Sequence, residues 1–153
     1  IGLLAECAGS PGMVGGQVLD IMSQERELSE QEVLDIQSRK TGALINAACA
    51  LGAIAGGASD EQFNAACQFA AGLGLAFQIR DDMLDVIGNA DEFGKPIGSD
   101  KEEGKVTFVD VLGLDGCAKE VERCTEQAKA AVENWSDHMF LWELADRMVG
   151  RNQ

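Results

Sequence analysis

Apolar residues recur every three or four positions along most of the chain, whereas the strict alternation typical of strands is almost absent. This spacing gathers apolar side chains on one face of a helix, so we predict a succession of helices. Ser29 and Ser59 are each followed three residues later by Glu or Gln, a pattern that caps helix starts. The expected helices, with a bend near Lys40 in the third and a loop at 90–106, cover residues 1–8, 14–22, 29–55, 60–87, 107–113, 116–134 and 137–149.

The size and composition of the chain predict one globular all-α domain over residues 1–153. Its 153 residues are 46% hydrophobic, which is enough for a sizeable core. We find no internal repeat, no low-complexity tract and no linker to a second domain. Alanine and glycine are frequent in segments 43–58 and 65–76, where they permit helices to approach closely. A helical bundle is therefore expected.

Charge, hydropathy and cysteine usage exclude several kinds of protein. The formal net charge of −14 argues against binding to nucleic acid or to an anionic membrane. The most apolar stretch, residues 42–59, is mostly Ala and Gly and barely reaches the roughly 18 residues of a membrane span. The five cysteines form no CxxC pair, which is typical of reduced thiols in a cytoplasmic protein. The chain begins with Ile1, and we expect it to be part of a longer protein.

An unusual cluster of acids lies in the segment FQIRDDMLDV, residues 77–86. On a helix, Gln78, Asp81, Asp82 and Asp85 share an arc of roughly 100°. The positions three or four residues away from these aspartates carry no Lys or Arg. Carboxylates without protein cations are stabilised by protonation or by a bound cation, and their hard oxygens suit Mg²⁺. On spacing alone, a metal site and a solvated acidic face fit equally well.

The same helical strip becomes small and apolar toward its N-terminus, at Gly74, Ala71, Ala70 and Cys67. A wall that is acidic at one end and apolar further along is typical of a binding pocket. We therefore expect a ligand that is polar at one end and apolar at the other.

Two basic segments could receive an anion despite the acidic total. In QSRKTGALI, residues 37–45, Lys40 is a suitable phosphate partner and Thr41 a hydrogen-bond donor, while Gly42 leaves room for approach. In the glycine-containing loop 94–107, Lys95 and Lys105 could fold over a polyanion. Solvated surface lysines are the alternative interpretation of that loop. No Walker pattern supports a nucleotide-binding P-loop.

The combination of motifs is more specific than any one of them. In chain order these are GGQ (15–17), KTG (40–42), FQIRDDMLD (77–85), GK (94–95), Asp100 and GKVT (104–107). This combination resembles the trans-isoprenyl diphosphate synthases, the polyprenyl synthetase family, which includes farnesyl and geranylgeranyl diphosphate synthases. The resemblance covers essentially the whole chain. The aspartate block looks like the second of the family's two aspartate-rich motifs, so the chain resembles the C-terminal half of such an enzyme.

The resemblance implies a partial isoprenoid-synthase helical bundle and a Mg²⁺-dependent prenyltransferase, cytoplasmic and homodimeric. Its substrates would be isopentenyl diphosphate and an allylic prenyl diphosphate, and the half without the first motif would be inactive alone. The resemblance also implies a role for each matching residue: Asp81 as direct metal ligand; Asp82 and Asp85 binding metal-bound waters or orienting the site; Lys40 and Lys95 on the allylic diphosphate; Thr41 and Gln78 positioning it and supporting proton loss; Lys105 and Asp100 completing a closing loop; and Gln17 near the pocket.

Two other kinds of protein compete with this interpretation. A non-catalytic subunit or binding module of the same fold usually loses aspartates, whereas Asp81, Asp82 and Asp85 are all present. A class I terpene cyclase shares the fold and the metals, but the KTG and GKVT elements favour a diphosphate synthase.

Overall fold

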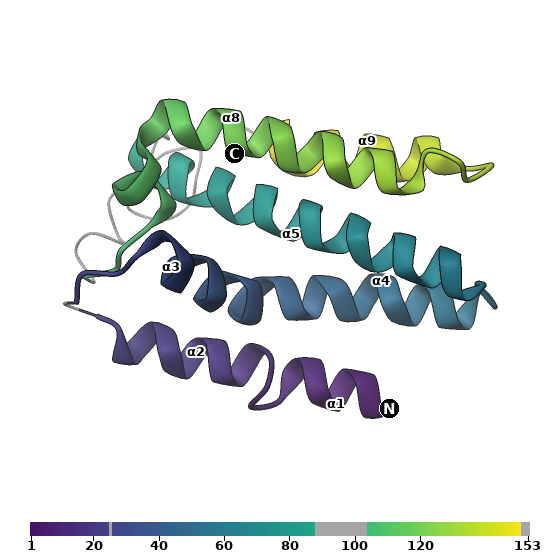
Figure 1. Ribbon diagram of the computed structural model, residues 1–153, viewed down its shortest axis with the longest axis horizontal. Helices are drawn as coiled ribbons and strands as arrows, with labels where there is room; N and C mark the ends of the chain where they lie inside the picture. The colour runs from purple at the N-terminus through teal and green to yellow at the C-terminus, as the bar shows by residue number, and fades with distance from the viewer. Residues whose placement is uncertain (25, 88–103, 151–153) are drawn as a thin grey trace.

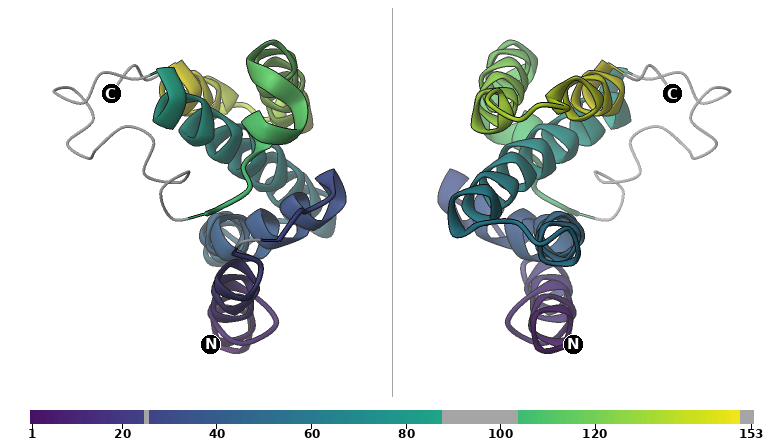
Figure 2. Two further views of the ribbon diagram at one scale, coloured as in Figure 1. Left: turned by 90° about the vertical axis from the view of Figure 1, so that its left-hand side faces the viewer. Right: turned by 90° about the vertical axis from the view of Figure 1, so that its right-hand side faces the viewer.

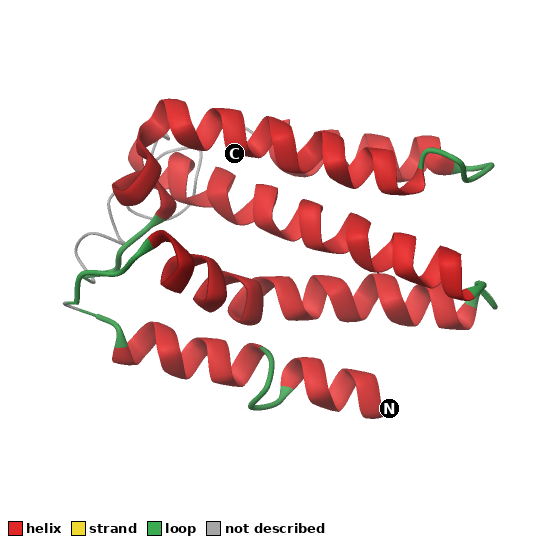
Figure 3. Ribbon diagram, in the orientation of Figure 1, coloured by secondary structure: helices red, strands yellow, loops and turns green. Residues whose placement is uncertain are grey.

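The computed structural model describes residues 1–24, 26–87 and 104–150, and these residues form helices joined by turns, with no strand among them (Figures 1 and 3). The all-α fold predicted from the apolar spacing is confirmed. The elements are α1 (Gly2–Ala8), α2 (Met13–Met22), α3 (Glu30–Gln37), the π-helical segment η1 (Ser38–Gly42), α4 (Ala43–Ala55), α5 (Asp60–Ile87), α8 (Phe108–Val132) and α9 (His138–Gly150).

The helices lie side by side with roughly parallel axes (Figure 1), and we call helices that follow one another along the same axis a rod. Helices α1 and α2 follow one another along the outermost rod, and α3, η1 and α4 form the next rod without a break in the chain. Helix α5 lies in the middle, packed on α4 and η1 on one side and on α8 and α9 on the other. The end-on views show α8 and α9 together on the side of α5 that faces away from α1 and α2 (Figure 2).

Polar caps fix the helix starts where the sequence places them. The Ser29 hydroxyl accepts from the Glu32 N–H while the Glu32 carboxylate accepts from the Ser29 N–H at 2.9 Å, a complete capping box. In the same way, the Gln62 side-chain oxygen accepts from the Ser59 N–H, and the Ser59 hydroxyl accepts from the Gln62 N–H. Each such cap satisfies helix N–H groups that have no partner within the helix and contributes about 1 kcal/mol.

Helix α8 is kinked near its start. Gly113 has φ 67° and ψ 166°, a backbone conformation that other residues rarely adopt, and it separates a short first segment from the rest of α8. This break accounts for the two separate helices that the sequence predicts at 107–113 and 116–134. A second capping box, between Thr107 and Asp110, fixes the first segment.

The core follows α5 along its whole length. One cluster of buried side chains lies near the C-terminal end of α5 and a second lies around its middle, and burial of each large apolar side chain contributes about 1.5–3 kcal/mol. The first contains Val33, Ile79, Met83, Phe108 and Cys117, and the second Phe69, Leu73, Ala128, Val132 and Ala145. Beside the second cluster, Gly72 lets α5 approach α8, because a Cβ atom there would lie 2.8 Å from the Cys124 carbonyl oxygen and 3.0 Å from the Ala128 Cβ atom.

All five cysteines are free thiols, and Cys117 and Cys124 are buried in the core. Among the helices that the structure describes, none combines the length and apolarity needed to cross a membrane.

Candidate active site

A polar pocket of about 300 Å³ lies at the end of the bundle where α2 and α5 end and α8 begins. It brings together residues that are up to 87 positions apart, since it is formed by α2, the end of α3, η1, α5 and the segment that precedes α8. Six of the residues predicted from the sequence contribute to it: Lys40, Thr41, Gln78, Asp81, Asp82 and Lys105. The other lining residues are Asp20, Gln37, Phe77, Val106 and Thr107.

The remaining predicted site residues do not line this pocket in the described part of the chain. Asp85 lies on α5 and is buried, with an exposed fraction of 3%. Gln17 is exposed on α2. Lys95 and Asp100 lie outside the described residues. The roles assigned to these four residues therefore stay predictions.

The lysine and threonine of the KTG motif lie within a π-helical segment. Segment η1, Ser38–Gly42, interrupts the rod formed by α3 and α4, and both Lys40 and Thr41 belong to it. A π turn holds an extra residue, so it changes the direction of the side chains around it, and such turns are frequent at functional sites. Where the sequence predicts a bend near Lys40, the structure thus has a π-helical segment, and its Lys40 and Thr41 line the pocket.

Gly16 allows α2 to lie directly against η1. A Cβ atom on Gly16 would lie 2.4 Å from the Lys40 backbone nitrogen and 2.8 Å from the Arg39 Cβ atom. Real Cβ atoms do not come so close to backbone atoms, so only glycine fits here. The GGQ motif therefore sets the distance between α2 and the pocket lysine.

Asp20 is the pocket residue that sequence reasoning missed. The Lys40 Nζ atom donates a hydrogen bond to Asp20 Oδ2 at 2.7 Å. The ion pair is sheltered from solvent, since the exposed fractions of the Lys40 and Asp20 side chains are 27% and 10%. A signal was present in the sequence, because Asp20 follows Gly16 by four positions and so lies on the helix face that meets η1.

A chain of hydrogen bonds crosses the pocket wall from α8 to η1. The Phe108 backbone N–H donates to Asp82 Oδ2 at 2.9 Å, and Gln78 Nε2 donates to Asp82 Oδ1 at 2.9 Å. The Thr41 hydroxyl then donates to Gln78 Oε1, also at 2.9 Å. In this arrangement the hydroxyl hydrogen of Thr41 goes to Gln78 and not to a ligand.

The charged groups of the pocket suit a metal ion held together with an anionic ligand. Its lining contains the carboxylates of Asp20, Asp81 and Asp82 and the ammonium groups of Lys40 and Lys105. Within the described residues, no group of three or more His, Cys, Asp or Glu side chains could hold a metal by itself. Mg²⁺ is commonly held by one or two carboxylates plus water and phosphate oxygens, so the half-buried Asp81 fits this mode of binding.

The Asp82 carboxylate lies near a buried cysteine of the neighbouring core. Burial raises the pKa of the Cys117 thiol to about 11, with a smaller contribution from the nearby Asp82 carboxylate. Cys117 is therefore an uncharged core thiol under ordinary conditions and has no part in the pocket's chemistry.

An apolar groove of about 430 Å³ continues from the polar pocket, and the two share Gln37 and Gln78. Small and aliphatic side chains form much of its surface, among them Leu34, Gly42, Ala43, Ala71, Gly74 and Leu75. Of the small residues predicted to continue along α5, Ala71 and Gly74 line this groove, whereas Ala70 is fully buried and Cys67 does not line it. The groove also has polar lining residues, which include Asp35 and Asn46.

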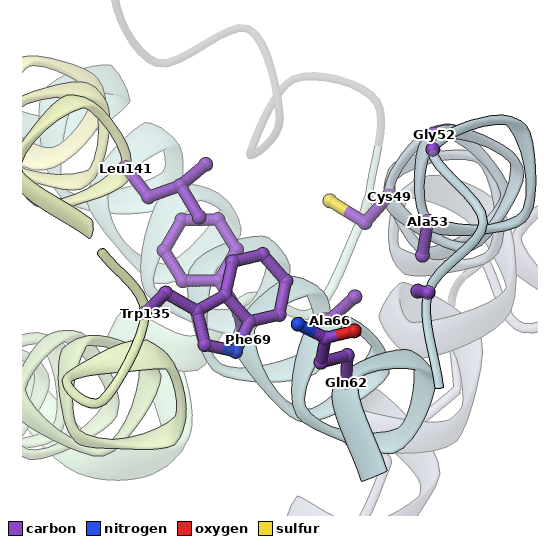
Figure 4. A pocket seen from close by; sticks show the side chains of 10 residues that line it. Cys49, Gly52, Ala53, Gln62, Ala66, Phe69, Trp135 and Leu141 are labelled. Carbon is purple, nitrogen blue, oxygen red and sulfur yellow. The ribbon is translucent and has the colours of Figure 1, made fainter. Parts of the chain in front are cut away.

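A separate apolar pocket of about 380 Å³ lies at the other end of the bundle, where α4 ends and α5 begins (Figure 4). Phe69, Trp135 and Leu141 face Cys49 and Ala53 across it. Its described lining contains no charged residue. Because a diphosphate needs cationic partners, and the described lining of this pocket supplies none, the polar pocket is the candidate active site.

The polyprenyl synthetase family model matches residues 3–139. The chain belongs to the polyprenyl synthetase family. Family membership explains why KTG and the aspartate block meet in one pocket although they are nearly 40 residues apart.

Individual relatives agree with this assignment. The chain is 35% identical over 150 residues to a farnesyl diphosphate synthase of Bacillus subtilis, and the match covers 97% of the chain and 51% of the relative. A polyprenyl synthase of Caulobacter crescentus, solved with calcium and isoprenyl diphosphate, has a TM-score of 0.89 at 27% identity, covering 99% of this chain and 58% of that one. A geranyltransferase of Helicobacter pylori, solved with magnesium and isoprenyl diphosphate, has a TM-score of 0.80 at 27% identity, covering 97% and 49%. The chain spans about half the length of these relatives.

Proposed function

We propose that this chain is the part of a prenyltransferase that binds the diphosphate of an allylic substrate and, with Mg²⁺, promotes its departure. In the proposed reaction the double bond of isopentenyl diphosphate attacks the allylic carbon, the diphosphate leaves, and a proton is lost, which yields a chain five carbons longer. The observation that carries the proposal is the convergence of Lys40, Asp81 and Lys105 on one pocket that continues into an apolar groove.

The cationic groups would act on the leaving diphosphate. Negative charge grows on its oxygens as the carbon–oxygen bond breaks, so fixed cations stabilise the transition state more than the ground state. Lys40 and Lys105 line the pocket and are placed for this task, and Lys95 is proposed to join them from the loop. Asp20 would hold the Lys40 ammonium group in place at 2.7 Å while the pocket is without substrate.

The aspartates would contribute in different ways. Asp81 is proposed as the direct metal ligand of this helix, because it lines the pocket and is only half-buried. Mg²⁺, when bound, would supply Lewis-acid stabilisation of the charge on the diphosphate. The magnesium and calcium complexes of the two solved relatives support a divalent cation. Asp85 is proposed to support the α5 end from its buried position.

The apolar groove would hold the hydrocarbon part of the allylic substrate. Glycine and alanine side chains along η1, α4 and α5 leave space, and the leucines supply apolar contact. Gln78 and Thr41 lie where the groove meets the polar pocket, so they would position the reactive carbon and support proton loss. This division agrees with a substrate that is charged at one end only.

A second copy of the chain is the proposed partner. Helix α2 carries an exposed apolar stripe with helical spacing, formed by Val14, Val18, Ile21 and Met22. Exposed stripes of this kind typically mark protein–protein contacts. Light scattering should give twice the monomer mass for the purified protein, and a monomer at micromolar concentration would contradict the dimer.

The activity is tested by assaying the protein expressed from its complete open reading frame with isopentenyl diphosphate and an allylic diphosphate. We expect elongation that requires Mg²⁺ and stops with EDTA. Binding of diphosphates without elongation would favour a non-catalytic subunit, and release of a cyclic hydrocarbon from the allylic substrate alone would favour a terpene cyclase. Either result would overturn the proposed function.

A further inference from the structure

Asp82 lines the polar pocket, but its side chain is buried between α5 and α8 and both of its oxygens accept hydrogen bonds from protein N–H groups. Its exposed fraction is 2%. One oxygen accepts the Phe108 backbone N–H and the other accepts Gln78 Nε2, each at 2.9 Å. The first bond fixes the carboxylate to the start of α8, and the second connects it to the pocket.

The direction of each hydrogen bond from Asp82 to Thr41 follows from which of these groups can donate and which can only accept. An ionised carboxylate has no hydrogen to donate, so the part of the Gln78 amide that faces Asp82 must be the NH₂ group. The amide oxygen must then face Thr41. Because that oxygen can only accept, the Thr41 hydroxyl must donate, and its lone pairs are what it presents to the pocket.

We propose that Asp82 is a positioning residue, which fixes the Gln78 amide and thereby the direction of the Thr41 hydroxyl, and that it is not a ligand of the metal. This assigns separate tasks to two neighbouring acids that both line the pocket: Asp81 is half-buried, whereas Asp82 is buried and directs its oxygens to N–H groups of the protein. The kinetic part of the test rests on the proposed prenyltransferase function.

The substitution Asp82→Asn reverses the donors and acceptors of this chain of hydrogen bonds, and asparagine has nearly the same shape as aspartate. The Phe108 N–H still needs an acceptor, so the new amide oxygen stays there and the new NH₂ group faces Gln78. Gln78 must then present its oxygen to the new donor and its NH₂ group to Thr41. The Thr41 hydroxyl accepts this bond and turns its hydrogen into the pocket. We expect kcat to fall about tenfold to a hundredfold, as for a misplaced catalytic group.

Two kinetic measurements separate positioning from metal binding. In Thr41→Val, which lacks the hydroxyl, the added Asp82→Asn change should lower kcat by less than about twofold, because both act through the same group. The Mg²⁺ concentration for half-maximal activity should stay within about twofold of the wild-type value in Asp82→Asn and rise about tenfold or more in Asp81→Asn. Multiplicative losses in the double variant, or a tenfold rise for Asp82→Asn, would overturn the proposal.

A matched control distinguishes positioning from stability. Asp110→Ala removes the capping box at the same end of α8, where the Thr107 N–H donates to Asp110 Oδ2 at 2.8 Å, without touching Gln78. It should lower the melting temperature, because α8 loses a cap, but keep kcat within about twofold. A comparable loss of kcat in Asp110→Ala would show that α8 stability alone explains the effect.

An NMR measurement, which needs no catalytic turnover, tests the chain of hydrogen bonds independently of the proposed function. In ¹⁵N-glutamine-labelled protein, the side-chain NH₂ resonances of Gln78, identified by their loss in Gln78→Leu, should move clearly in Asp82→Asn and little in Asp81→Asn. Unchanged Gln78 resonances in Asp82→Asn would overturn the inference even if the enzyme is active. If the wild-type protein is inactive but the resonances shift as expected, the proposed function is overturned and the proposed chain of hydrogen bonds is still supported.

Discussion

Replacement of Gly16 by alanine tests whether the contact between α2 and η1 sets the geometry of the site. The added Cβ atom would lie 2.4 Å from the Lys40 backbone nitrogen, whereas ordinary Cβ contacts begin near 3.4 Å. Since backbone atoms cannot rotate away, α2 or η1 must move by about 1 Å to restore normal packing. That movement displaces the Lys40 and Asp20 pair.

The expected loss of stability can be estimated from the same contact. Overpacking of this kind costs about 1–3 kcal/mol, which exceeds the gain of about 0.5–1 kcal/mol for glycine to alanine in a helix. The net cost is then up to about 2.5 kcal/mol, so for a chain of this size the melting temperature should fall by up to about 10 °C, because each kcal/mol corresponds to about 2–4 °C. A displacement of about 1 Å at Lys40 can lower kcat by about a hundredfold.

Gly52→Ala is the matched control, because a Cβ atom on this exposed α4 glycine would meet nothing within 4 Å. It should raise the free energy of unfolding by about 0.5–1 kcal/mol and leave kcat unchanged. Thermal unfolding and steady-state kinetics on both variants decide the matter. If Gly16→Ala melts at the wild-type temperature with wild-type kcat, the structural account of the α2–η1 contact is wrong.

Three further predictions concern single residues. Asp81→Ala should lower turnover by at least about a hundredfold, as for a lost electrostatic stabiliser, and near-normal turnover would contradict its role. Burial raises the pKa of the Cys117 and Cys124 thiols from 9.0 to about 11, so about a hundredfold less thiolate should be present at these residues in the native protein. Both thiols should therefore resist alkylation at pH 8 until the chain is unfolded, and rapid labelling of the native protein would contradict the raised pKa values. Hydrogen bonds from Arg123 lower the pKa of Glu120 below 4.5, so they stabilise the folded protein fully above pH 4.5 and this stabilisation is lost as the pH falls through the lower pKa of the folded state. The melting temperature of Glu120→Gln should therefore fall less steeply with acid than that of the wild type, and identical pH profiles would contradict the role of these hydrogen bonds.

Much of the fold could be predicted from the sequence because its signals are local. The caps at Ser29 and Ser59 act within three residues, and the apolar spacing of 60–87 describes a single long helix. The position of Gly113 between two helical patterns likewise marked the kink in α8. Each of these features depends on neighbours that the printed sequence places side by side.

The parts that the sequence missed depend on contacts between distant segments. The π-helical form of η1 leaves no distinct spacing, and it coincides with the place where Gly16 brings α2 against Lys40. Asp20 gains its meaning only from the ion pair with a lysine 20 positions away. Spacing placed Asp82 on one face with Asp81 and Asp85, but it could not predict that the Phe108 N–H, 26 positions away, donates to the Asp82 carboxylate.

The central claim is that the polar pocket holds a divalent cation and a diphosphate together. A crystal structure of the protein from its complete reading frame, grown with Mn²⁺ and a non-reactive allylic diphosphate analogue, tests it directly through the anomalous signal of the metal. We predict Mn²⁺ coordinated by an Asp81 oxygen, with the diphosphate between the metal and the Lys40 ammonium group and the hydrocarbon chain in the groove beside Gly74. A diphosphate bound elsewhere, with no metal at Asp81, would contradict the account.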